Sequence, residues 1–91
     1  MVIKETENFI LGCYTSEILH IVNYVIFAKN KDGSNYQVAS INNGLEKRTA
    51  MMTTETFQNT ITTWELFKEF IMLVDEAYDL LRVDKGIYYN E

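Results

Sequence analysis

The sequence predicts an α+β fold: a four-stranded antiparallel β-meander with one long C-terminal amphipathic helix packed on one sheet face. Three observations predict this fold. Residues 61–82 place apolar side chains at helical spacing. The segment HIVNYVIFAK is rich in strand-forming Val, Ile, Tyr and Phe. Two dipeptides typical of hairpin turns, Asp32-Gly33 and Asn43-Gly44, follow it. The 91 residues are expected to form a single domain, 1–91.

The strands are expected at about residues 2–14, 18–29, 34–42 and 45–54. A rival interpretation makes residues 16–29 a helix with Ser16 as its cap. The β-branched residues of this segment and the Asp-Gly turn after it favour the strand.

Two-residue turns would fix the register of the three later strands. The facing pairs around the first turn are then Phe27 with Val38 and Lys29 with Tyr36. Those around the second turn are Val38 with Thr49 and Tyr36 with Met51. One sheet face then carries small and branched side chains that suit a covering helix: Val22, Tyr24, Ile26, Ala28, Ala39, Ile41, Ala50 and Met52.

The opposite sheet face is predicted to be the partner-binding surface. Its residues are Val25, Phe27, Lys29, Tyr36, Val38, Lys47 and Met51. An apolar patch of this size is unusual on a monomer, so a second copy, a different protein or the bases of a single strand should cover it. In another interpretation, residues 1–14 or the C-terminal tail fold over this face, or it stays solvated.

The predicted helix has a recognisable start. Thr62 and Glu65 have the spacing of a capping box, and Ile61 with Leu66 suits a hydrophobic staple. Its apolar arc is about 180° wide, which predicts packing on a broad surface such as a sheet. Trp64 lies on the boundary of this arc. We expect the helix to stop near Gly86.

The other half of the helix is acidic. Its residues are Glu65, Glu69, Met72, Asp75, Glu76 and Asp79, with Met72 as the apolar exception. Residues 62–91 hold seven acids and three bases, so they carry most of the net charge of −5. Such a face either keeps the protein soluble or attracts a basic partner, and its charge disfavours binding to duplex DNA.

The residues favour a non-enzymatic protein without a cofactor or metal. No GxxxxGK(S/T), GxGxxG, GxSxG or HExxH motif occurs. One Cys and one His cannot build a zinc site without several carboxylates. Cys13 fits a buried position in an apolar run, and His20 fits a packed or edge position at the start of a strand. The single cysteine and the polar N-terminus indicate a cytoplasmic protein, and no apolar run approaches the ~20 residues of a membrane span.

The strand order and the helix entry Ile61-Thr62-Thr63-Trp64-Glu65-Leu66-Phe67-Lys68 resemble the positive-cofactor-4-like family of single-stranded-DNA-binding transcriptional coactivators. The entry is similar to that family's I-[ST]-L-T-x-E-x-[WF]-K. The family's basic strand residues are mostly missing here, so the resemblance implies a fold rather than a function.

The function that the residues favour is a small acidic protein-interaction or inhibitor module that forms a homodimer. The composition, rich in Asn, Ile, Lys, Glu and Tyr without Pro, is compatible with an AT-rich phage or mobile element. The alternative is a single-stranded nucleic-acid-binding protein. It would stack bases on Phe27 and Tyr36 and contact phosphates through Lys29 and Lys47.

Overall fold

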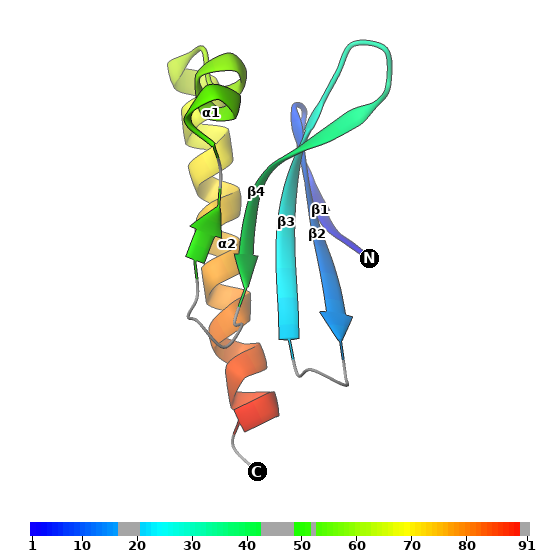
Figure 1. The fold of residues 1–91 in the computed structure, drawn as a ribbon, viewed down its shortest axis with the longest axis vertical. Helices are drawn as coiled ribbons and strands as arrows, with labels where there is room; N and C mark the ends of the chain where they lie inside the picture. Colours follow the sequence, from blue (N-terminus) through cyan, green and yellow to red (C-terminus); the bar gives the residue numbers. More distant parts are fainter. Residues whose placement is uncertain (17–20, 43–48, 52, 90–91) are drawn as a thin grey trace.

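The computed structural model describes residues 1–16, 21–42, 49–51 and 53–89 (Figure 1). Its elements are β1 (Val2–Glu5), β2 (Phe9–Ser16), β3 (Ile21–Lys29), β4 (Asn35–Asn42), β5 (Thr49–Met51), α1 (Thr54–Thr60) and α2 (Trp64–Tyr89). The strands form one antiparallel sheet in the order β1-β2-β3-β4-β5, and α2 packs against β2, β3 and β4. The predicted α+β meander with a C-terminal helix is confirmed.

The two ends of the sheet differ from the prediction. The expected first strand, residues 2–14, divides into the hairpin β1–β2, where the Thr6 N–H donates to the Phe9 carbonyl at 2.9 Å. The expected fourth strand, residues 45–54, contributes only the three residues of β5 among those described. Helix α1, where a loop was expected, begins after Thr53, whose hydroxyl accepts from the Thr56 N–H at 3.1 Å.

The segment with two competing interpretations is a strand. Residues Ile21–Lys29 form β3 at the centre of the sheet, so the rival helix over residues 16–29 is wrong. Its β-branched residues pack well on a pleated surface, which explains the outcome. His20 lies outside the described residues.

The turn between β3 and β4 has three residues rather than two. The Asn30 N–H donates to the Ser34 carbonyl at 2.8 Å, so residues 31–33 form the loop. Gly33 has φ of 91°, the left-handed conformation that a three-residue hairpin loop places at its last position. The Asp32 carboxylate accepts from the Ser34 N–H at 2.9 Å. This loop shifts the first pairs by one residue relative to the prediction.

A β-bulge at Val38 then restores the predicted register. Phe27 pairs with Gln37 and Lys29 with Asn35, whereas Ile26 pairs with Ala39 as predicted. The predicted pairs of Phe27 with Val38 and of Lys29 with Tyr36 are therefore wrong. The bulge has a large consequence, because a one-residue shift moves a side chain to the opposite sheet face. Val38 and Tyr36 both lie on the side of the sheet that the helices cover.

The register of β4 with β5 also differs from the prediction. Asn42 pairs with Thr49 and Ser40 with Met51, so Thr49 does not face Val38 and Met51 does not face Tyr36. A two-residue turn at Asn43-Gly44 would instead have paired residue 42 with residue 45. Asn43-Gly44 itself lies outside the described residues.

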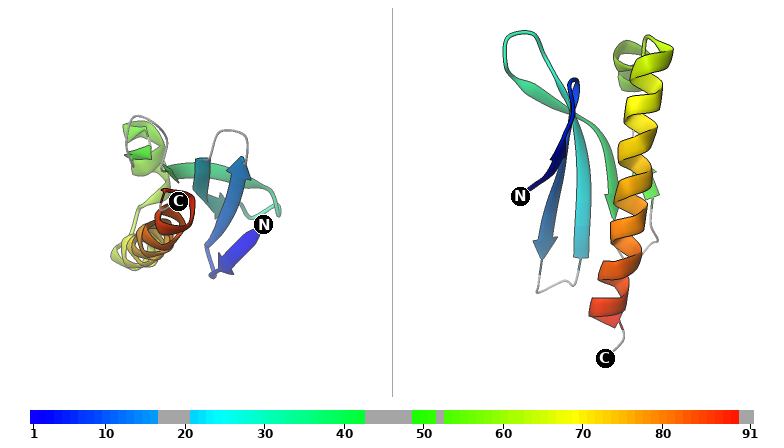
Figure 2. Two further views of the ribbon diagram at one scale, coloured as in Figure 1. Left: turned by 90° about the horizontal axis from the view of Figure 1, so that it is seen from below. Right: turned by 180° about the vertical axis from the view of Figure 1, so that it is seen from behind.

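The core lies between one face of the sheet and α2, which runs along that face (Figure 2). Six of the eight side chains predicted for this face are buried there: Val22, Tyr24, Ile26, Ala28, Ala39 and Ile41. Strand β2 adds Phe9 and Leu11, and the bulge adds Val38. The helix contributes Phe70, Leu73, Ala77 and Leu81. The alternating apolar pattern of β3 and the 3.6-residue pattern of α2 therefore meet in a single core.

The start of α2 lies one residue later than predicted. The Thr63 hydroxyl accepts from the Leu66 N–H at 3.1 Å, and the Thr63 carbonyl accepts from the Phe67 N–H at 3.1 Å. Thr63 is therefore the N-cap, and the predicted capping box of Thr62 and Glu65 is wrong. The helix also continues through Gly86 to Tyr89, so the predicted stop at Gly86 is wrong.

We expect Thr63→Ala to lower the free energy of unfolding by about 1 kcal/mol, because it removes the N-cap acceptor. Thr62→Ala is the matched control, since Thr62 is exposed and should change stability by less than about 0.5 kcal/mol. Urea denaturation of the two variants measures the difference. A larger cost for Thr62→Ala would instead support the capping box.

Candidate functional site

The structure does not assemble the predicted partner-binding sheet face. Val38 is buried in the core with 2% of its surface exposed, and the Tyr36 hydroxyl lies 2.8 Å from the Thr60 hydroxyl of α1. Phe27 alternates with the core residues of β3 and therefore faces away from α2. The two aromatic rings expected to stack bases thus lie on opposite sides of the sheet. Nucleic-acid binding stays a prediction, but Phe27 and Tyr36 do not share the sheet face on which they were expected to stack bases.

The other predicted residues of that face are covered, ion-paired or undescribed. Val25 is buried between its cross-strand partners Gly12 and Ser40. The Lys29 ammonium pairs with the Glu5 carboxylate at 2.5 Å and donates to the Thr6 carbonyl at 2.8 Å. Met51 pairs with Ser40 through the backbone, but its side chain, like the whole of Lys47, lies outside the described part.

The acidic helix face divides into two groups. Glu69 accepts hydrogen bonds from the Thr6 hydroxyl and from the backbone and side-chain N–H groups of Asn8, both at 2.9 Å. The Glu76 carboxylate lies 3.6 Å from the Lys4 ammonium. These two acids therefore attach α2 to the β1–β2 hairpin. Exposed positions of the predicted face are Glu65, Met72, Asp75 and Asp79.

The environment of Glu69 favours its charged form. Burial of the carboxylate alone would raise its pKa, but hydrogen bonds from Asn8 and Thr6, together with the charge of Lys29, lower the pKa below its ordinary value. Because the pKa of Glu69 is lower in the folded than in the unfolded state, its charged carboxylate stabilises the fold at pH values above the unfolded-state pKa. This stabilisation is lost as the pH falls through the folded pKa.

We expect Glu69→Gln to lower stability at neutral pH by about 1.5 kcal/mol, because charge-assisted hydrogen bonds weaken. The difference from wild type should shrink below about pH 4.5, where the unfolded carboxyl becomes protonated. Urea denaturation across pH measures this, with Glu65→Gln as the exposed control. If the free energy of unfolding fell equally with acid in wild type and in Glu69→Gln, the stabilising role of the charged Glu69 carboxylate would be contradicted.

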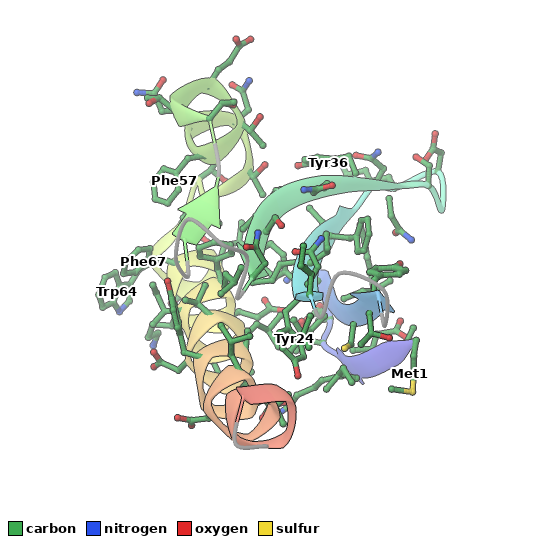
Figure 3. The ribbon with its side chains drawn as sticks, turned by 60° about the horizontal axis from the view of Figure 1, so that its bottom comes forward. Met1, Tyr24, Tyr36, Phe57, Trp64 and Phe67 are labelled. Atoms are coloured by element: carbon green, nitrogen blue, oxygen red, sulfur yellow. The ribbon has the colours of Figure 1, made fainter. Side chains whose placement is uncertain are left out.

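Helix α2 carries an apolar surface that none of the described elements covers, and we call it the outer helix surface. It consists of Phe57 from α1 and Trp64, Phe67, Ile71 and Met72 from α2. The rings of Trp64 and Phe67 stack with centroids 5.4 Å apart and an interplanar angle of 27°. Figure 3 shows Trp64 and Phe67 together on the side of α2 that points away from the sheet. Trp64 is 64% exposed and Met72 is 44% exposed.

The outer helix surface is hollowed at two adjoining places. One shallow hollow of about 410 Å³ lies at the junction of α1 and α2, between Phe57 and Trp64. A second, of about 430 Å³, follows α2 from Trp64 to Asp75. Both are lined by Trp64 and Phe67, and the second also by Lys68, Ile71 and Met72. Apolar side chains with a few charges at the edge are typical of protein-binding surfaces.

The sequence contained a signal for this surface. The helical wheel placed Trp64 at the boundary of the apolar arc and Met72 within the polar half. Apolar side chains at such positions indicate either that the helical face was assigned wrongly or that these side chains contact a partner. The pattern did not show that the apolar arc is wider than the part that the sheet covers. Phe67 and Ile71 lie within this arc by helical spacing, yet Ile71 is exposed.

Three further observations bear on the kind of site. Within residues 1–16, 21–42, 49–51 and 53–89, no group of three or more His, Cys, Asp and Glu side chains is placed to hold a metal ion. In the same part of the chain, no helix has the length and apolar character to cross a membrane. Comparison with protein-family models, curated proteins and solved structures found no match to the sequence or the fold.

Proposed function

We propose that this chain is a small acidic protein-interaction module that binds its partner through the outer helix surface. The observation that supports the proposal is the exposed, stacked pair of Trp64 and Phe67, continued along α2 by Ile71 and Met72. Trp is among the residues that most often dominate interface energetics. The proposal moves the partner-binding surface from the sheet to α2.

Contact with water makes the outer helix surface unfavourable to leave exposed. Each of these side chains leaves apolar area in contact with water, which costs about 25 cal/mol per Å² relative to burial. A large indole that already stacks on Phe67 loses little further freedom on binding. Met72 is flexible and polarisable, so it adapts to a partner's shape. The chain contains a single cysteine, Cys13, so it has no internal disulfide, which is compatible with the cytoplasm, where we place this interaction.

Site-specific photo-cross-linking in cells tests the proposal. A photo-reactive amino acid at position 72 should give protein adducts of discrete mass, because Met72 lies in the outer helix surface. The same amino acid at position 31 is the control, since Lys31 is exposed in the β3–β4 turn far from α2 along the chain. Adding Trp64→Ser should abolish the adducts from position 72. Equal adducts from both positions, or none from position 72, would contradict the proposal.

A further inference from the structure

We propose that the occupant of the outer helix surface is a second copy of this chain, whose α2 packs antiparallel to α2 of the first. This inference rests on the proposed function and names the partner. A closed dimer requires a self-complementary surface, in which a residue contacts one partner residue and that residue's equivalent returns the contact. The charges beside the outer helix surface, on Lys68 and Asp75, meet this requirement.

Lys68 and Asp75 carry opposite charges on the same stripe of α2. Both line the hollow that Trp64, Ile71 and Met72 also line. They are seven residues apart, about two helical turns or ~10 Å along the axis. A two-fold axis between Ile71 and Met72 places Lys68 of each subunit opposite Asp75 of the partner subunit, which gives two equivalent ion pairs. It also places Ile71 opposite Met72 of the partner subunit, so an apolar centre lies between two ion pairs.

Two acids of α2 already bind within the same chain, which matters for a chain of net charge −5. Glu69 and Glu76 contact the β1–β2 hairpin. Among the residues that line the hollow along α2, Asp75 is the single acid and Lys68 the single base. A partner with only basic side chains at its edge would instead meet Lys68 with a like charge.

The length of the surface indicates how tight the dimer is. Residues 64–79 of α2 extend about 24 Å, so one helix pair buries less than the roughly 800 Å² per partner of a standard interface. Phe57 of α1 adds apolar area at the end next to Trp64. We therefore expect a reversible dimer with a dissociation constant in the micromolar range, which a concentration series detects.

Sedimentation equilibrium of the full chain with charge-swapped variants tests the inference. The mass of wild type should rise from one chain to two chains with concentration. Lys68→Asp and Asp75→Lys should each weaken the dimer by about tenfold, because each puts like charges opposite one another twice. The double variant Lys68→Asp/Asp75→Lys should recover wild-type affinity to within about threefold, since its ion pairs are re-formed in reverse.

Matched controls separate this effect from net charge. Lys31→Asp changes the net charge as Lys68→Asp does, and Glu7→Lys as Asp75→Lys does. Both control residues are exposed in turns, and their variants should dimerise like wild type. A one-chain mass for wild type at every concentration would overturn the second-copy inference, while discrete cross-links to another protein would still support the proposed function. A double variant as weak as the single variants would overturn the antiparallel register.

Discussion

Replacing Val38 by aspartate is expected to leave most of the protein unfolded. The Val38 side chain is 2% exposed and packs in the core with Ala39 and Ile41. A carboxylate there would have no charged partner among the described core residues, which are apolar. Burying an unpaired charge costs several kcal/mol, a large share of the roughly 5–15 kcal/mol that stabilises a small domain.

Circular dichroism and urea denaturation measure this effect, and Gln37→Asp is the matched control. Gln37 is the exposed neighbour of Val38 and pairs with Phe27 on the opposite side of the sheet. Its substitution should change stability by less than about 0.5 kcal/mol. Without the bulge, Val38 would lie on the open face and tolerate a charge. A folded Val38→Asp variant with a wild-type urea midpoint would therefore contradict the register.

Replacing Leu73 by alanine is expected to cost about 3 kcal/mol of unfolding free energy. Leu73 is fully buried in the part of α2 that packs on the sheet, in the same cluster as Phe70 and Ala77. Truncation removes buried apolar area and leaves a cavity that close-packed neighbours fill only in part. The range for such substitutions is about 2–5 kcal/mol.

Glu65→Ala is the control for Leu73→Ala, because Glu65 is exposed on the same helix. Urea denaturation at a concentration where the chain is monomeric should show a change of less than about 0.5 kcal/mol for this variant. Similar costs for the two variants would mean that α2 does not dock on the sheet through the face that carries Leu73.

The parts of the fold predicted from sequence are those with strong periodicity. Strand β3 alternates apolar side chains, and α2 repeats them at helical spacing, so six core positions of the sheet were identified correctly. Helix α1 was missed because Thr54–Thr60 is rich in Thr and contains Asn, which have low helix propensity. Its signal was Thr53, a cap residue directly before the helix.

The length of the β3–β4 turn was predicted wrongly from the sequence. Asp32-Gly33 suits both a two-residue type I′ turn and a three-residue loop with Gly33 at its last position. The two alternatives differ by a single residue of register, and that residue decides which face a side chain occupies. Tyr36 and Val38 were therefore placed on the wrong face, although their strand was correct.

The candidate site was predicted only in part, for a geometric reason. A helical wheel gives the width of an apolar arc, but only the tertiary structure shows how much of the arc the sheet covers. In α2, Leu73 and Ala77 are buried, whereas Trp64 and Ile71 extend beyond the sheet. The acidic half was predicted as one surface, yet Glu69 and Glu76 bind the β1–β2 hairpin.

Fluorescence of Trp64 tests the central claim most directly. It is the single tryptophan of the chain, so its emission reports on the outer helix surface alone. Between about 1 µM and 1 mM chain, a range that spans micromolar dissociation constants, we expect the emission maximum to shift to shorter wavelength as the indole leaves water. Lys68→Asp should move this transition to higher concentration. A two-chain mass without any shift in Trp64 emission would contradict the claim, because the copies would then meet elsewhere.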